Sequence, residues 1–315
     1  MNFKLNNFFL IAVTLLYVSV SFHQKTYSQK INLVPQDWKA GDRIEDPLKW
    51  VEVGIGDIPL VISVPHGGTF HDDEIMDRDC KDVGRVVKGV DSKTISTARA
   101  IEEEFAKNHG SRPYVVMAKL SRRKVDQNRE IKLAACSDPF GEIAWKNYHS
   151  SIEAVIKDAV DKFGYVLFVD LHGHGHTIQR LELGYALNKN QLQTVFNDKD
   201  ADLLQKSSMV NLLNVAKKNI DLTDVLFGSN SLGAIFTNEG FPATPSMQDT
   251  YPVKDEKFFS GGHITRKFTS STYPNVFGLQ IECNYKGVRD TPENRSKFGK
   301  AFAKAYTHFL NSFVK

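Results

Sequence analysis

Three residues whose side chains could bind a metal or move a proton follow or end predicted buried strands. His66 follows the apolar run Leu60–Val64, His172 follows the run 165–171, and Glu282 ends the run 276–282. Neutral imidazoles and carboxylates are zinc ligands, and a catalytic zinc site keeps one position for water. A carboxylate in an apolar strand needs a partner, because burying it alone costs roughly several kcal/mol. The pattern predicts one zinc ion, with another divalent metal as the alternative, held by His66 and His172 with Glu282 as the general base.

The third ligand of such a site is expected to be a carboxylate, and several residues compete for this role. Asp91 opens a predicted helix, so that its side chain could point into the same cleft. Asp72, Asp73 and Glu74 lie in the loop after His66 and are alternatives. Asp91 could instead act as the N-cap of the helix, because its side-chain oxygen suits that position. The sequence leaves this choice open, with Asp91 as the preferred ligand.

The segment His172-Gly173-His174-Gly175-His176 offers further imidazoles. His174 and His176 compete with His172, because a His-rich tract with interspersed glycines can bind a metal by itself. His172 is preferred since it comes directly after the strand. Asp170 is predicted to orient an imidazole by accepting its other N–H. His71 is a weaker competitor.

A basic segment, residues 121–129, follows another predicted strand and contains Arg122, Arg123 and Arg129. Arginine binds carboxylates through two parallel hydrogen bonds and also stabilises a developing oxyanion. The segment is therefore expected to bring an arginine into the cleft. Arg180 and Glu182, just after the His-rich segment, are expected to line the same cleft.

The elements that must position these residues alternate between strands and helices. The predicted strands are Leu60–Val64, Tyr114–Ala118, 165–171, 181–187 and 276–282, and the predicted helices are 94–108, 144–163, 201–218 and Pro292–Phe313. Residues 29–58 are expected to form an irregular lead-in. Alternation of this kind predicts a three-layer α/β fold, with a mostly parallel or mixed central sheet and helices on both faces. Ligands in such sheets bind beyond the carboxyl ends of the strands.

Composition limits the class of partner. The 315 residues include 40 basic and 37 acidic side chains, which give a formal net charge of +3. This balance argues against nucleic acid as a partner. Three cysteines, Cys80, Cys136 and Cys283, have no close pairing in sequence and leave open whether a disulfide forms.

The N-terminal residues are predicted to be a targeting segment. Residues 8–20 form an almost unbroken apolar run that is short for a bilayer span but has the length of a signal-peptide core. We expect residues 1–21 to be a signal peptide, with cleavage as late as residue 28, and an uncleaved anchor is the alternative. Residues 29–315 would then be a single catalytic domain, exported to the periplasm or the medium and without stable membrane insertion.

The order of the motifs resembles that of the N-formylglutamate amidohydrolase family, which is similar in fold to zinc-dependent exopeptidases and amidases. The motifs are Val64-Pro65-His66-Gly67-Gly68, Asp91 with Thr94, the segment 123–129, Tyr148-His149, the segment 170–176 with 180–184, Gly261-Gly262-His263 and the segment 279–282.

The resemblance implies a phosphorylase/hydrolase-like α/β fold with one zinc ion. By analogy it makes His66, Asp91 and His172 the ligands and Glu282 the general base. The resemblance also implies roles around the substrate, with Arg122 or Arg123 polarising its carbonyl group and Asn128, Arg129, Arg180 and His263 binding it. The sequence departs from the carboxypeptidase HxxE pattern, because Thr69 stands three residues after His66.

The function predicted from the sequence is zinc-dependent hydrolysis of a linear amide C–N bond, in a small molecule or peptide that bears a carboxylate. The predicted signal peptide departs from the cytoplasmic role of formylglutamate hydrolysis in histidine breakdown. An exported peptidoglycan or peptide amidase, or a carboxypeptidase on the same fold, is therefore the first alternative. A ligand-binding protein that has lost catalysis is the second.

Overall fold

The computed structural model describes residues 38–80, 86–217, 220–253 and 255–314, and its strands form one mixed sheet. Within these residues the strand order is β1-β2-β4-β3-β5-β8-β6-β7. The strands are β1 Arg43–Glu45, β2 Val51–Gly54, β3 Leu60–Val64, β4 Tyr114–Ala118, β5 Val166–His174, β6 Leu181–Gly184, β7 Ala243–Thr244 and β8 Val276–Asn284. The mixed sheet predicted from the sequence is thereby confirmed.

The four central strands β4, β3, β5 and β8 run parallel, whereas β2 and β6 are antiparallel to their central neighbours. Their carboxyl ends therefore meet at one edge of the sheet. The register places His172 beside Glu282 and Ser63 beside Asp170. Every residue of β3, β4 and β8 is buried, as expected for strands covered on both faces.

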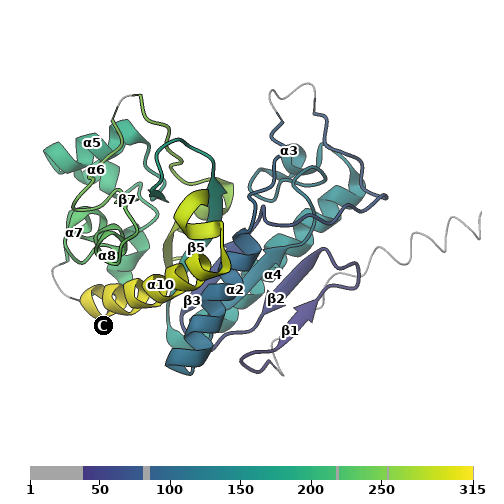
Figure 1. The fold of residues 1–315 in the computed structure, drawn as a ribbon, viewed down its shortest axis with the longest axis horizontal. Helices are drawn as coiled ribbons and strands as arrows, with labels where there is room; N and C mark the ends of the chain where they lie inside the picture. The colour runs from purple at the N-terminus through teal and green to yellow at the C-terminus, as the bar shows by residue number, and fades with distance from the viewer. Residues whose placement is uncertain (1–37, 81–85, 218–219, 254, 315) are drawn as a thin grey trace, which may run out of the picture. The chain divides into compact units, whose positions relative to one another are not determined.

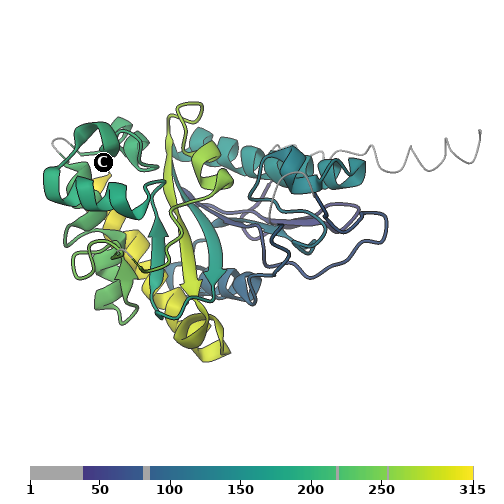
Figure 2. The same cartoon turned by 90° about the horizontal axis from the view of Figure 1, so that it is seen from above.

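Helices cover both faces of this sheet. Figure 2 shows the sheet nearly edge-on, with α4 on one side and α2 and α10 on the other, and Figure 1 shows α2 and α10 side by side. The helical segments are α2 Thr94–Glu104, η3 Phe105–His109, α3 Ile131–Ala135, α4 Pro139–Phe163, α5 Lys189–Asp198, α6 Ala201–Leu204, η4 Val210–Asn214, α7 Leu222–Phe227, α8 Leu232–Asn238, α9 His263–Phe268, η5 Tyr285–Arg289 and α10 Pro292–Phe313. The predicted three-layer arrangement is confirmed.

The two longest helices have sequence signals at both ends. The Asp138 side chain accepts a hydrogen bond from Gly141 N at 2.8 Å, proline occupies the first turn, and α4 ends at Gly164 with φ of 82°. In α10, Thr291 caps Asn294 N in the same way, before Pro292. α10 begins and ends where the sequence predicted, while α4 begins earlier than predicted.

Two predicted segments were wrong. The helix predicted for 201–218 breaks after α6, because Ser208 and Asn211 bind other parts of the chain. Ser208 Oγ donates to Gly278 O at 2.6 Å, and Asn211 Nδ2 faces four carbonyl oxygens that include Val276 O at 3.0 Å. These bonds fix the chain against the start of β8 and compete with helical hydrogen bonding. The lead-in predicted to be irregular contains β1 and β2, which extend the sheet beyond β4.

The state of the cysteines, which the sequence left open, is defined by the structure. Cys80 and Cys136 form a disulfide with a Cα–Cα distance of 5.2 Å, and Cys283 is free and buried. Among the described residues, no helix has the length and apolar character that a membrane span needs. The predicted signal peptide, residues 1–21, lies outside the described residues.

Candidate metal centre

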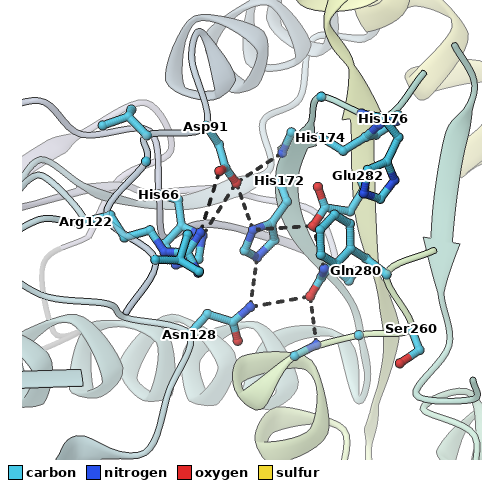
Figure 3. A pocket seen from close by; sticks show the side chains of 18 of the residues that line it. His66, Asp91, Arg122, Asn128, His172, His174, His176, Ser260, Gln280 and Glu282 are labelled. Carbon is cyan, nitrogen blue, oxygen red and sulfur yellow. Dashed lines mark hydrogen bonds and ion pairs between the residues drawn. The ribbon is translucent and has the colours of Figure 1, made fainter. Parts of the chain in front are cut away.

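Three side chains point their ligand atoms toward one another at the carboxyl ends of β3 and β5 (Figure 3). Asp91 Oδ2 lies 3.1 Å from His172 Nδ1 and 3.5 Å from His66 Nδ1. All three atoms lie within 4.8 Å of one another. Ligand atoms held about 2.0–2.1 Å from a tetrahedral zinc are about 3.4 Å apart. The spacing therefore suits a single cation.

The opposite nitrogen of each imidazole is held by a buried carboxylate. His66 Nε2 donates to Asp126 Oδ1 at 2.6 Å, and His172 Nε2 donates to Asp170 Oδ2 at 3.0 Å. Asp170 is held in turn by Ser63 Oγ at 3.0 Å. These bonds direct both Nδ1 atoms toward Asp91, and carboxylates in this position raise the basicity of an imidazole ligand.

A buried nitrogen without a hydrogen bond supports the fit of a metal. His66 Nδ1 is buried and makes no hydrogen bond to the residues that the structure describes. Burial without a hydrogen bond is costly for a polar atom, and such an atom calls for an explanation. A cation between His66, Asp91 and His172 would satisfy it. Two nitrogens and one carboxylate oxygen suit zinc and other first-row divalent ions.

Asp91 reaches this position because its side chain does not cap α2. The residue before α2 is Lys93, in a left-handed conformation and without a side-chain cap, so that the N-cap role considered for Asp91 was wrong. The Asp91 backbone N–H donates to His66 O at 3.0 Å, and its carboxylate also accepts from Gly173 N at 3.2 Å. Loop and strand therefore hold the carboxylate between the two imidazoles.

The charges at the centre perturb one another. Burial by itself would raise the pKa of Asp91, but the imidazoles of His172 and His66 hold this pKa well below its usual range. Burial likewise opposes the charge on His172, yet Asp170 and Asp91 raise the pKa of His172 well above its ordinary value. Without a cation, a proton on His172 Nδ1 thus occupies the place where a metal would bind.

Glu282 is the second carboxylate beside His172 and remains outside the ligand group. Its Oε1 lies 4.0 Å from His172 Nδ1 and accepts from Gln280 Nε2 at 2.8 Å. Burial raises the pKa of Glu282 to about 8; the charge of His172 opposes this shift, and that of Asp91 adds to it. A carboxylate with a pKa near neutrality is suited to take and return a proton.

A cavity of about 500 Å³ opens over these residues. The lining includes charged and polar side chains from four loops or strands: His66, Asp91, Arg122, Asn128, Arg129, His172, Gln280 and Glu282. Phe258 and Phe259 contribute an apolar wall. The cavity can therefore receive a polar ligand with an anionic group.

The structure separates the two arginines proposed to polarise a carbonyl group. Arg122 lines the cavity, donates to Asp126 Oδ2 at 2.9 Å and lies 4.0 Å from Asp91 Oδ1. The Arg123 side chain is 51% exposed, pairs with Asp77 and does not line the cavity. The catalytic role predicted for Arg123 is therefore corrected, because its side chain points away from the centre.

Of the residues predicted to bind substrate, some line the cavity and others do not. Arg129 is exposed at the cavity, whereas the Asn128 side chain lies 3.2 Å from His172 Nε2 and accepts from Ile264 N at 2.9 Å. Arg180 is buried between Asp249 and Glu256, at 2.8 and 2.6 Å, and does not line the cavity. His263 does not line it either and faces Glu130 at 3.1 Å. Arg180 and His263 therefore do not line the cavity that they were predicted to line.

The other carboxylates considered as ligands lie elsewhere. Asp72 Oδ2 accepts from Trp50 Nε1 at 2.7 Å, while Asp73 and Glu74 are exposed. His71 is exposed as well. None of these belongs to a ligand group among the described residues, so Asp91 is the carboxylate that the structure brings to the imidazoles.

Three positioning residues were not identified from the sequence. Asp126 lies within the basic segment, and its charged neighbours suggested an exposed residue of a surface loop. Gln280 accepts from Gly262 N at 2.8 Å and donates to Glu282. Arg289 is buried and donates to Cys283 O at 3.0 Å and His174 O at 2.8 Å, which joins the ends of β8 and β5. The polar residue Gln280 in an apolar strand was the one available signal.

Comparisons with known proteins complete the description. No protein-family model and no curated protein matches the sequence. Among solved structures, the chain is similar to N-formylglutamate amidohydrolase from Ralstonia eutropha JMP134, with 13% identity, a TM-score of 0.47 and coverage of 83% of this chain and 96% of that one. It is also similar to a gene product of Agrobacterium tumefaciens, with 12% identity, a TM-score of 0.45 and coverage of 82% and 94%. A metallo-carboxypeptidase from Burkholderia cenocepacia shows 11% identity, a TM-score of 0.38 and coverage of 93% and 69%.

Proposed function

We propose that this protein is a zinc-dependent hydrolase that cleaves an amide C–N bond in a small molecule or peptide bearing a carboxylate. The observation that carries the proposal is the convergence of His66 Nδ1, His172 Nδ1 and Asp91 Oδ2, with the far nitrogen of each imidazole bonded to a carboxylate. Metal-binding histidines are oriented in this way. The cavity above the three atoms supplies access for a substrate.

His66, Asp91 and His172 would hold the ion. When bound, zinc lowers the pKa of a water molecule to about 7 and polarises a carbonyl oxygen. Glu282 accepts the proton of the attacking water and returns it to the leaving nitrogen. Its position beside His172, and its pKa raised by burial to about 8, suit both transfers.

Two arginines at the cavity have separate roles in this proposal. Arg122 is held in place by Asp126 and stabilises the negative charge that develops on the carbonyl oxygen. Arg129 is exposed at the cavity and binds the carboxylate of the substrate through its guanidinium group. The Asn128 side chain accepts from Ile264 N and holds α9 rather than the substrate.

We also propose that the protein acts outside the cytoplasm. The disulfide between Cys80 and Cys136 supports this location, because disulfides persist in oxidising compartments. An exported amidase has access to cell-wall peptides, so the substrate class includes muropeptides as well as N-formyl and N-acyl amino acids.

The test is a pair of variants assayed with N-formylglutamate, other N-acyl amino acids and muropeptides. Glu282→Gln should lower kcat by about 10²–10⁴-fold, the usual contribution of a general base. Zinc content should stay at the wild-type level, because Glu282 is not a ligand. Glu239→Gln, at an exposed position, is the matched control and should keep full activity. Undiminished turnover in Glu282→Gln would refute the mechanism, and activity that resists metal removal would refute the class.

A further inference from the structure

A second group of ligand-type side chains lies beside the candidate metal centre and has no role in the proposed mechanism. His174, His176 and Glu182 bring one ligand atom each to within 4.8 Å of the others. His174 ends β5, Glu182 lies in β6, and His176 lies in the connection between them. His174 and Glu182 are buried, and the His176 side chain is 16% exposed.

Hydrogen bonds from the surrounding backbone direct the ligand atoms of this group toward one another. His174 Nε2 donates to Arg180 O at 2.8 Å, which leaves His174 Nδ1 unprotonated and 4.0 Å from Glu182 Oε1. The other oxygen of Glu182 accepts from Phe259 N at 2.9 Å. The His176 ring stacks on the Phe259 ring, with centroids 4.8 Å apart. Carbonyl and amide groups in these outer positions orient metal ligands in proteins.

The bonds inside the group are those that a cation would replace. His176 Nδ1 donates to Glu182 Oε1 at 2.6 Å, and His174 Nδ1 accepts from His176 N at 3.1 Å. A proton therefore sits where an ion would bridge His176 and Glu182. An ion in place of these two hydrogen bonds would have two imidazole nitrogens and one carboxylate oxygen as ligands.

The second group shares one face of the sheet with the first. Glu282 is paired in register with His172 on one side and with Glu182 on the other. Side chains of register partners point to the same face, as do those of residues two apart in one strand, such as His172 and His174. His174 and His176 line the same cavity as His66 and Asp91, as Figure 3 shows.

From this arrangement we propose a second cation site formed by His174, His176 and Glu182, which takes a divalent transition ion such as zinc or cobalt. Its imidazole and carboxylate ligands suit this class of ion better than calcium or magnesium, which prefer oxygen ligands. With the proposed function, the cavity would hold two ions, and Glu282 would lie between them. The second site stands on its own contacts and does not depend on the activity.

Ion stoichiometry tests the proposal without an activity assay. The full-length protein is dialysed to equilibrium against zinc, and bound zinc is measured by mass spectrometry, with cobalt absorption spectra as a second readout. Wild-type protein should bind two ions, His176→Gln one, His66→Gln one, and the double variant none. Outer partners alone change metal affinity by about 10–100-fold, so losing the His176 ligand should weaken the second ion by more than about 100-fold.

Controls separate a lost ligand from a lost fold. His176 is the first choice because it is the most exposed of the three, and Glu182→Gln, which can keep the bond to Phe259, is the second variant. His71→Gln removes an exposed imidazole outside both groups and should bind two ions. Circular dichroism confirms that each variant is folded.

The outcomes distinguish this inference from the proposed function. One ion in wild type, lost in His66→Gln and kept in His176→Gln, overturns the second site and leaves the catalytic centre standing. One ion lost in His176→Gln but kept in His66→Gln supports the second site and overturns the catalytic centre. A second ion that persists in both His176→Gln and Glu182→Gln also overturns the proposal, since the ion then binds elsewhere.

Discussion

At the scale of single residues, the hydrogen bond made by Nε2 of each imidazole determines what its Nδ1 can bind. His66 and His172 each donate through Nε2 to a buried carboxylate, and these bonds direct Nδ1 of each ring at Asp91. A histidine without such a partner could turn its ring and direct neither nitrogen at the metal. The carboxylates of Asp126 and Asp170 are therefore as much a part of the centre as the ligands.

Asp126→Asn tests this positioning role. Asparagine keeps the size of the side chain but loses the charge that supports His66, so zinc affinity should fall by about 10–100-fold. Competition with a fluorescent chelator measures the change. Asp161→Asn, at an exposed position on α4, should leave the affinity unchanged. Wild-type affinity in Asp126→Asn would show that His66 is oriented by packing alone.

His149 gives a pH dependence that does not involve the metal. It is buried and donates through Nε2 to Gln127 O at 2.9 Å; burial and the charge of Lys267 lower its pKa to about 3. The unfolded chain binds a proton at His149 below about pH 6.5, while the folded chain does not. His149 should therefore destabilise the fold as the pH falls from about 6.5 toward 3, by at most about 1.4 kcal/mol per pH unit.

Urea unfolding between pH 7 and 4 checks this expectation. His149→Gln, whose amide can still donate to Gln127 O, should show a shallower loss of stability than wild type, and His308→Gln on the exposed face of α10 should not. Equal slopes in wild type and His149→Gln would mean that His149 is protonated in the folded state.

At the scale of elements, a helix or strand could be predicted where its structure depends on residues close in sequence. β3 and β4 have the predicted bounds because short β-branched runs, stopped by proline, glycine or polar residues, are recognisable without knowledge of the fold. The segment 201–218 was mispredicted because its structure depends on bonds from Ser208 and Asn211 to distant carbonyl groups. Such bonds leave no periodic trace in the sequence.

The residues of the candidate site also fall into those that could be predicted from local sequence and those that could not. His66, His172 and Glu282 could be predicted because strand ends in a parallel sheet meet at one edge. The direction of side chains in the loop 121–129 could not, so that Arg122 and Arg123 stayed alternatives and Asp126 was overlooked. Strand alternation fixes which side a residue faces, whereas an irregular loop has no such rule.

The disulfide is the element-scale feature that ties the segment before Asp91 to the body of the protein. Cys80 and Cys136 are 56 residues apart in sequence, and closing a loop of this length stabilises the fold by about 4 kcal/mol in the chain-entropy description. The double variant Cys80→Ser with Cys136→Ser should lose about this much in guanidinium unfolding. Cys283→Ser, which removes the free thiol, is the matched variant. Reducing agent should lower its unfolding midpoint, as in wild type, but should leave the midpoint of the double variant unchanged. A wild-type midpoint that ignores reducing agent would contradict the pairing.

At the scale of the whole molecule, the fold gathers carboxyl groups at one buried place. Five side chains contribute: Asp91, Asp126, Asp170, Glu182 and Glu282, all buried or nearly so. Burying carboxylates is costly unless charges of the opposite sign accompany them. Arg122 and Arg78, which both pair with Asp126, supply part of this compensation, and protons on the histidines add to it. Bound cations would supply the rest.

Metal removal should therefore weaken the entire fold. An ion that binds only the folded chain adds about 2.7 kcal/mol of stability when its free concentration is about 100 times its Kd. Dialysis against a chelator should lower Tm, and added zinc should restore it in wild-type protein. In His66→Gln the chelator should have a smaller effect, because one site is already lost, while His71→Gln should respond as wild type does. Differential scanning calorimetry measures the Tm of all three proteins. A wild-type Tm that responds to neither chelator nor zinc would show that protons and arginines alone balance the buried carboxylates.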